Sequence, residues 1–209
     1  LAAQGVDVDM PCWDDASVDW ASFDIAVLRS TWDYAERIGE FLEWADRCAR
    51  LTRLANPVET VRWNTDKRYL LELSQAGVPV VPTRFVSPGA DASMELMRFL
   101  DGGAGSLTYG HADGFTDFVV KPVIGAASRD AARYARVDGT AALAHLARLL
   151  ETGRQTMLQP YLDRVDAHGE TAVIFFDGVL SHSVRKGPLL KRGARLVSGL
   201  FAPERITPR

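Results

Sequence analysis

Phe-Val-Val-Lys-Pro at residues 118–122 combines β-branched and aromatic side chains with a lysine, which is typical of a strand that ends at Lys121. The segment 125–128, Gly-Ala-Ala-Ser, follows it, and its small residues favour a flexible loop. A lysine at a strand end can meet a phosphate chain there, while backbone N–H groups and the Ser128 hydroxyl supply further donors. The alternative is a solvated lysine beside an ordinary turn. Neither a Walker A pattern nor a GxGxxG motif occurs.

Apolar patterns on both sides of this strand predict that strands and helices alternate along the chain. Alternating or continuous apolar runs predict further strands at residues 6–10, 24–28, 78–83, 132–137, 156–159, 171–176 and 179–184. Apolar residues at helical spacing predict helices at residues 36–51, 66–76, 94–100 and 141–150. These patterns indicate an α/β protein.

Two local signals fix the ends of elements. Thr65 is expected to cap the helix at 66–76, and Gly77 is placed to end it in the left-handed conformation. The face of this helix that points inward is expected to carry Tyr69, Leu70, Leu73 and Ala76. Asp177-Gly178 separates the last two predicted strands and is the dipeptide that best specifies a two-residue type I′ hairpin turn.

Composition excludes several classes of function. The chain has 209 residues, 47% of them hydrophobic, and a formal charge of −3, so it can bury a core and has no basic patch for nucleic acid or a membrane surface. No apolar run approaches the length that crosses a bilayer, and Cys12 and Cys48 are too few for a disulfide framework. We therefore expect a cytoplasmic protein with a small-molecule substrate, for which a homo-oligomer is one option. Leu1 at the start and the Pro-containing loop before Arg209 suggest truncation at both ends.

Three further motifs occur in a fixed order along the chain. They are Asp66-Lys67 at the expected start of a helix, Gln159-Pro160-Tyr161-Leu162 at the end of a strand, and Gly169-Glu170-Thr171 at the start of the hairpin. Together with residues 118–122, this order resembles the ATP-grasp superfamily of ligases from about residue 63 to residue 186.

The resemblance implies an ATP-grasp fold with an α+β lid, preceded by a Rossmann-like N-terminal domain. The expected divisions are a partial α/β domain at 1–60, a connecting helix and strand at 61–86, the lid subdomain at 87–160, and an incomplete core subdomain at 161–209. The resemblance also implies ATP and Mg²⁺ as cofactors.

The motifs carry the family's nucleotide-binding roles to particular residues. By resemblance, Lys67 and Lys121 contact the phosphates, and Gln159 and Leu162 read the adenine while Tyr161 flanks it. For Lys67 the alternative is a solvated residue in the first turn of a helix. The Ser128 loop would complete the phosphate site.

The ribose and the reacting phosphoryl group are assigned in the same way. Glu170 directly precedes a strand and is the preferred ribose ligand, while Asp166, seven residues beyond Gln159, competes for that role. Arg185, followed by Lys186, lies where similar ligases hold the reacting phosphate or acyl phosphate, and a guanidinium suits that charge. The alternative for Arg185 is a surface arginine at a strand end.

One segment indicates a branch of the superfamily. Arg-Ser-Thr-Trp-Asp-Tyr at residues 29–34, followed by Arg-Trp-Asn-Thr-Asp-Lys at 62–67, resembles small bacterial ligases near the cycloserine-forming ligase of antibiotic biosynthesis. Arg29 and Asp33 follow a predicted strand and could bind an amino-acid head group. Equally, Trp32 and Tyr34 could pack a domain interface while Arg29 and Asp33 pair locally. Ala172 stands where the glutathione-synthetase branch has an arginine.

The resemblance implies a ligase that activates a small amino-acid-like carboxylate with ATP and forms a C–N bond, between two molecules or by ring closure within one. No residue present is assigned to the metal, whose ligands are expected beyond residue 209. Arg192, Arg195 and Arg205 are candidates for a lid over the phosphates. Two alternatives are a nucleotide-binding regulatory or degenerate module and a plain α/β scaffold protein.

The histidines carry no predicted chemistry. The four of them show no metal-ligand spacing, and His145, within a helical pattern, is expected to be solvated. Ser181 and Ser183 flank His182 on a strand, where neighbouring side chains point to opposite faces. We therefore do not expect a serine–histidine pair that could act as nucleophile and base.

Overall fold

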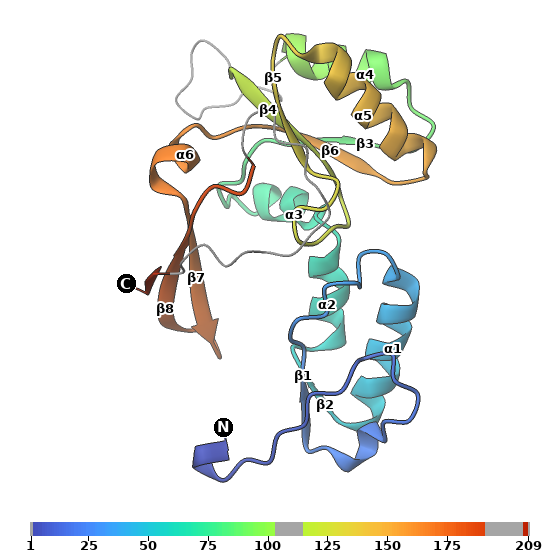
Figure 1. Ribbon diagram of the computed structural model, residues 1–209, viewed down its shortest axis with the longest axis vertical. Helices are drawn as coiled ribbons and strands as arrows, with labels where there is room; N and C mark the ends of the chain where they lie inside the picture. Colours follow the sequence, from blue (N-terminus) through green and yellow to red (C-terminus); the bar gives the residue numbers. More distant parts are fainter. Residues whose placement is uncertain (1, 103–114, 191–206, 209) are drawn as a thin grey trace. The chain divides into compact units, whose positions relative to one another are not determined.

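The computed structural model describes residues 2–102, 115–190 and 207–208 (Figure 1). The chain divides into two compact units, residues 1–69 and 70–209. Arg192, Arg195 and Arg205 lie outside the described residues. None of the described helices combines the length and the apolar character that crossing a bilayer requires.

The first unit is built on two parallel strands, β1 (Ile25–Val27) and β2 (Arg53–Ala55), with Ala26 opposite Leu54. Helix α1 (Ile38–Leu51) connects them, and α2 (Val58–Thr65) follows, while short 3-10 helices lie at Ala2–Gln4 and Trp20–Ser22. The strand predicted at 24–28 and the helix predicted at 36–51 are confirmed. The strand predicted at 6–10 is wrong: Val6, Val8 and Met10 are exposed, and no described strand pairs with them.

The core of this unit is aromatic. One face of α1 buries Phe41, Trp44, Ala45 and Cys48, which recur at helical spacing. Trp13 packs edge-on against Phe41, with ring centroids 5.5 Å apart. These contacts hold the helix on the β1–β2 pair.

The chain passes between the units through a short helix. Thr65 does not cap it, because Thr65 is the last residue of α2 and its hydroxyl donates to the Arg62 carbonyl. The helix α3 (Tyr69–Gln75) starts only after residues 66–68, so Asp66 and Lys67 precede it, and none of its residues is fully buried. The predicted cap is therefore wrong. Of the predicted inward face, Tyr69, Leu70 and Leu73 are half-buried, whereas Ala76 is exposed. Gly77 does end the helix in the left-handed conformation, with φ at 80°, as predicted.

The second unit contains a four-stranded antiparallel sheet. Its strands are β3 (Arg84–Val86), β4 (Asp117–Pro122), β5 (Ala132–Ala135) and β6 (Thr156–Pro160), in the order β3-β6-β4-β5. The strands around Lys121 and at 132–137 and 156–159 are confirmed. The strand predicted at 78–83 is wrong, because Pro79 and Pro82 lack the N–H that a ladder needs and pairing begins at Arg84.

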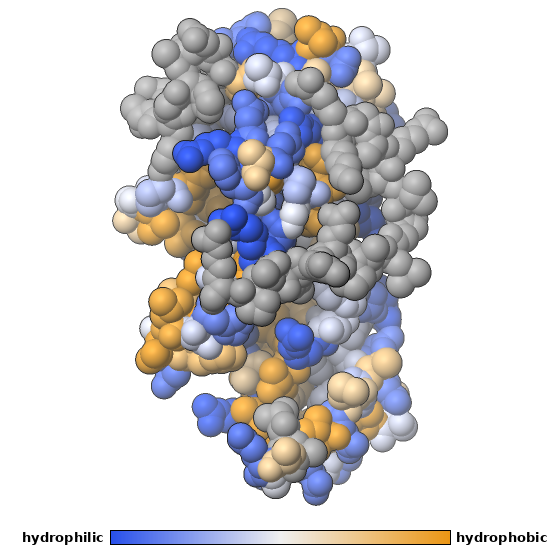
Figure 2. All heavy atoms as spheres, turned by 60° about the vertical axis from the view of Figure 1, so that its left-hand side comes forward, coloured by the Kyte–Doolittle hydropathy of each residue, from blue (hydrophilic) through white to orange (hydrophobic). Residues whose placement is uncertain are grey.

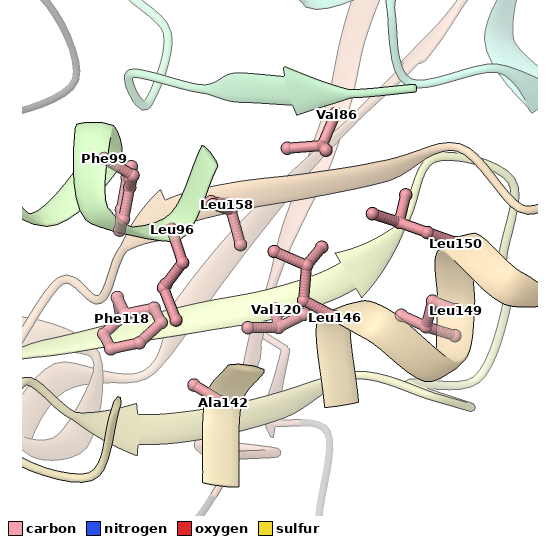
Figure 3. Close-up of a cluster of buried hydrophobic side chains, with 10 residues drawn as sticks. All are labelled: Val86, Leu96, Phe99, Phe118, Val120, Ala142, Leu146, Leu149, Leu150 and Leu158. Atoms are coloured by element: carbon pink, nitrogen blue, oxygen red, sulfur yellow. The ribbon is translucent and has the colours of Figure 1, made fainter. Parts of the chain in front are cut away.

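Two helices cover one face of this sheet: α4 (Ala92–Gly102) and α5 (Gly139–Glu151), both of which were predicted with slightly different ends. Figure 3 shows Phe118 and Val120 of β4 pointing into the same buried cluster as Leu96 and Leu146 of these helices. Side chains alternate across a strand, so the residues between them point away from the helices. Asp117, Val119 and Lys121 therefore share the other face of the sheet.

A helix and a hairpin complete the second unit. Helix α6 (Arg164–His168), which was not predicted, leads to β7 (Glu170–Phe176) and β8 (Val179–Lys186), and β9 (Thr207–Pro208) pairs with β8. Asp177 and Gly178 both have positive φ, which confirms the type I′ turn. Apolar side chains near this turn are exposed (Figure 2): Val173, Phe175, Phe176, Val179 and Leu180.

Candidate nucleotide site

Lys121 lies near the end of β4, on the sheet face that α4 and α5 leave uncovered. Burial lowers the pKa of its ammonium, and the nearby charge of Glu170, at the start of β7, opposes that shift. Two candidate residues from separate strands are thus within electrostatic reach of each other. A lysine ammonium that is partly removed from water and has one carboxylate nearby can donate hydrogen bonds to phosphate oxygens.

The loop after Lys121 has an unusual backbone. Ala127, Ser128 and Asp130 all have positive φ, and a side chain at Gly125 would lie 3.0 Å from the Pro122 ring. Ser128 is half-buried. Asp130 ends the loop and accepts hydrogen bonds from the guanidinium groups of two arginines, Arg148 and Arg154. The loop is therefore anchored at Asp130.

The segment predicted to read adenine follows β6. Gln159 is buried, and its side-chain amide donates to the Thr83 hydroxyl at 2.7 Å. The Tyr161 N–H donates to the Asp117 carbonyl at 2.8 Å, and Leu162 is exposed. Tyr161 is thus hydrogen-bonded to β4, and Leu162 follows it beyond the end of β6.

A charged network surrounds Tyr161. The Arg133 guanidinium lies 3.5 Å from the centroid of the Tyr161 ring, and its Nε atom donates to buried Asp117 at 2.6 Å. Arg133 also donates to Asp166 of α6 at 2.8 Å, and the Tyr161 hydroxyl donates to the same carboxylate at 2.7 Å. Both oxygens of Asp166 are therefore engaged within the protein. Sequence reasoning missed Arg133 and Asp117, because their pairing depends on the register of β4 against β5.

The pKa values of this network shift together. Burial raises the pKa of the Tyr161 hydroxyl to about 12, with a contribution from its hydrogen bond to Asp166. The Tyr161 hydroxyl and the Arg133 guanidinium lower the pKa of Asp166. Asp166 is therefore ionised at neutral pH, and the network carries one cation between two carboxylates.

Arg185 and Lys186 lie at the end of β8, opposite Thr171 and Glu170 of β7. The Arg185 Nε atom is buried and has no hydrogen-bond partner among the described residues. Buried polar groups are normally paired, so this atom fits a site for an anionic group. Lys186 is exposed, and its carbonyl passes so close to Gly169 that a side chain there would lie 2.2 Å from it.

The remaining candidates belong to the first unit. Lys67 is half-buried in the turn between α2 and α3. Arg29 is exposed beyond the end of β1, whereas Asp33 accepts a hydrogen bond from the Trp13 indole at 3.0 Å and lies 3.7 Å from Arg37. The partners of Asp33 are thus Trp13 and Arg37 rather than Arg29.

The histidine predictions need two corrections. His145 is buried rather than solvated: its Nδ1 atom lies 3.0 Å from the Tyr134 hydroxyl, and burial lowers its pKa to about 4. The Ser181 Oγ and His182 Nδ1 atoms lie 2.9 Å apart. The β7–β8 register is irregular at this point, and this disturbs the alternation of side chains. Both are exposed. Among the described residues, no group of three or more His, Cys, Asp and Glu side chains could hold a metal ion.

Comparisons with known proteins identify relatives of this chain. The family described as D-cycloserine synthetase DcsG, N-terminal domain, matches residues 1–56. The cycloserine biosynthesis protein DcsG of Streptomyces lavendulae is 44% identical over 186 residues, which are 89% of this chain and 59% of that protein.

Solved structures show the same relationship. The crystal structure of D-cycloserine synthetase DcsG aligns with a TM-score of 0.75 and 45% identity, over 86% of this chain and 57% of that one. A RimK domain ATP-grasp protein from Sphaerobacter thermophilus aligns with a TM-score of 0.53 and 18% identity, over 79% of this chain and 55% of that one, and supports the fold alone. The chain thus spans less than two thirds of the length of each relative.

Proposed function

The chain is a homologue of the D-cycloserine synthetase DcsG and has the ATP-grasp fold, and from this premise we propose that it carries the nucleotide site of an ATP-dependent ligase that forms a C–N bond. The observation that supports the proposal most is the desolvated Lys121 ammonium within electrostatic reach of Glu170, on the face of the sheet without helices. Lys121 would bind nucleotide phosphates there, and Glu170 would bind the ribose hydroxyls.

The geometry favours Glu170 over Asp166 for the ribose. Asp166 already accepts three hydrogen bonds, one from Tyr161 and two from Arg133, which leaves it fewer free acceptor positions for a sugar hydroxyl. Glu170 is exposed and opens β7. The Leu162 backbone, just beyond the end of β6, would contact the adenine, and Gln159 of β6 would support this segment through its hydrogen bond to Thr83.

The proposed reaction has two steps. A substrate carboxylate oxygen attacks the γ-phosphorus of ATP, the bond to the β-phosphate oxygen breaks, and ADP leaves. A nitrogen nucleophile then attacks the acyl carbon, loses a proton, and the C–O bond to the phosphate breaks. Arg185 and Lys186 would balance charge on the transferred phosphoryl group. Mg²⁺ bound to the phosphates would neutralise further charge, and no described residue is assigned to it.

The substrate class follows from the relatives. We propose a small amino-acid-like carboxylate, held in part by Arg29 and Trp32 beyond β1, where Arg29 and Trp32 are both exposed. Asp33 would then orient this segment through Trp13 and Arg37 rather than bind substrate itself. An O-substituted serine derivative that closes its own ring would need no second substrate.

Phosphate release by the natural full-length protein tests the proposal. With MgATP and a serine derivative that has a free carboxylate and a nitrogen nucleophile on its O-substituent, we expect ADP and phosphate in equal amounts, and a cyclic product by mass spectrometry without any added amine. The Lys121→Met variant should lose this activity. Arg98→Met removes a cation from the exposed side of α4 and is the matched control that should retain it.

Two results would contradict the proposal. Phosphate release that does not depend on any carboxylate would indicate an ATPase. Tight nucleotide binding with no release for a panel of carboxylates and amines would favour a regulatory or degenerate nucleotide-binding module.

A further inference from the structure

The network around Arg133 connects four separate segments of the second unit. Arg133 comes from β5, Asp117 from β4, Tyr161 from the segment after β6, and Asp166 from α6. It therefore joins the sheet that carries Lys121 to the segment that leads to Glu170. The charge of Glu170 reaches this network, because it contributes to the raised pKa of the Tyr161 hydroxyl.

Arg133 is largely buried by these contacts. Its side chain is 7% exposed, its Nε atom donates to Asp117, its terminal nitrogen donates to both oxygens of Asp166, and its plane covers one face of Tyr161. Such a side chain has little surface left for a ligand. Its function must be carried out through the residues that it holds.

The geometry uses features that only arginine offers. A planar guanidinium can stack on an aromatic ring at 3.5 Å while its edges donate to two carboxylates at once. Lysine carries the same charge on a compact ammonium and cannot do both. Asp117 is fully buried, so its charge requires this partner.

We propose that Arg133 is a positioning residue that clamps residues 161–169 to the sheet and thereby sets where Leu162 and Glu170 meet the nucleotide. Arg133 acts from β5, through Tyr161 and Asp166, on the two groups proposed to bind adenine and ribose. This inference rests on the proposed nucleotide site. It assigns to Asp166 a structural role within the clamp in place of direct contact with ribose.

Two measurements on the purified protein test the clamp. The first is hydrogen exchange of residues 162–169 without nucleotide, which reports the clamp whether or not ADP binds. The second is the affinity for ADP and for 2′-deoxy-ADP by calorimetry, which reports the position of Glu170. Arg133→Lys keeps the cation beside Asp117 and so preserves the fold, while Tyr161→Phe removes only the hydroxyl that donates to Asp166.

For Arg133→Lys we expect faster exchange confined to residues 162–169 and ADP binding weakened about tenfold, the loss expected when one charge-assisted contact no longer holds a site. The preference for ADP over 2′-deoxy-ADP should shrink as well. A residue that only stabilises the fold would accelerate exchange across the whole sheet and leave that preference unchanged. Tyr161→Phe should shift both measurements in the same direction, by a smaller factor.

Three outcomes would overturn the inference. Unchanged exchange of residues 162–169 in Arg133→Lys would show that the clamp does not hold the segment. Faster local exchange with unchanged ADP affinity would show that the segment does not position the nucleotide. If Tyr161→Phe raises the ribose preference, a released Asp166 carboxylate binds ribose directly. Absence of ADP binding in the unmodified protein would instead refute the proposed function, and with it the nucleotide part of this inference, while the exchange result still decides the clamp.

Discussion

Lys121 of β4 and Glu170 of β7 interact electrostatically although they belong to different sheets and are separated by β5, α5, β6 and α6 in the sequence. Burial lowers the pKa of Lys121, and Glu170 only partly opposes this. The protein thus keeps a cation in an unfavourable environment. A charge in such an environment does not stabilise the fold, which indicates that Lys121 serves to bind a ligand.

The first prediction is that replacing Lys121 has opposite effects on the stability of the fold and on nucleotide binding. Lys121→Met should leave the free energy of unfolding unchanged or raise it at pH 7, since it removes a partly desolvated charge, while it abolishes binding of MgADP. Chemical denaturation together with calorimetry measures both effects. A Met variant that is less stable and still binds ADP would contradict the assignment.

The pH dependence of the stability of the same variant tests whether the charge of Lys121 destabilises or stabilises the fold. The pKa of Lys121 is lower in the folded state, so the unfolded chain binds more protons near that pKa, and wild-type stability rises with pH there. The stability advantage of Lys121→Met is therefore full below the folded pKa and should shrink as pH rises towards the ordinary lysine value. Urea titrations between neutral and alkaline pH measure this gap. A gap that widens with pH would show that Lys121 stabilises the fold through its charge.

Glu170→Gln should weaken ADP binding and remove the preference for ADP over 2′,3′-dideoxy-ADP. A carboxylate accepts hydrogen bonds from two ribose hydroxyls, each worth about 1.5–3 kcal/mol when one partner is charged. Calorimetry with the two nucleotides measures the difference. Thr171→Ser, a neighbouring substitution on the same strand, is the control that should retain the preference. Retention of the preference by Glu170→Gln would exclude Glu170 as the ribose ligand.

Arg185→Met should be tolerated by the ligand-free protein. The Nε atom of Arg185 is buried without a partner among the described residues, so its removal relieves an unsatisfied donor. Phosphate release by the full-length protein should nevertheless fall on the order of a hundredfold, as for other groups that stabilise transferred charge. If this variant unfolds more readily and turns over normally, Arg185 serves the hairpin rather than the reaction.

Gly169 and Gly153 form a matched pair for testing the entry into β7. Both have positive φ, but a methyl group at Gly169 would lie 2.2 Å from the Lys186 carbonyl oxygen, whereas nothing lies within 4 Å at Gly153. Gly153→Ala should cost about 1 kcal/mol of stability, the usual penalty for that backbone conformation, and Gly169→Ala substantially more. Thermal unfolding compares them. Equal losses would mean that β7 and β8 do not approach as closely as described.

His145 should make the protein labile to acid. Its pKa is lowered to about 4 in the folded state, so the unfolded chain binds an extra proton between about pH 4 and 6.5, and stability falls as pH decreases through that range. The loss amounts to roughly 3 kcal/mol at most. His145→Leu should flatten the profile between these pH values. A profile that stays steep in the variant would assign the acid lability to other groups.

Strong local patterns were sufficient to predict much of the fold. The run around Phe118 and Val120 identified β4, helical spacing identified α1 and α5, and Asp177-Gly178 identified the hairpin turn. The errors lie where apolar residues alternate without a partner. Val6 and Val8 meet no second strand, and the prolines at 79 and 82 remove donors that a strand would need.

Only part of the candidate site could be predicted from the sequence. Lys121 and Glu170 could be identified from their motifs, but their proximity depends on the path of the chain from β6 through α6 to β7. Arg133 and Asp117 could not be recognised, because the strand register that places Arg133 opposite Val119 is set by tertiary packing. The burial of His145 depends in the same way on which face of α5 meets the sheet.

Calorimetric titration of MgADP into this chain and into Lys121→Met tests the central claim most directly. We predict micromolar binding to the unmodified chain, with a stoichiometry of one, and no detectable binding to the variant at the same concentrations. A folded, unmodified chain that gives no heat of binding, or a Lys121→Met variant that binds as tightly, would contradict the account of a nucleotide site built around Lys121.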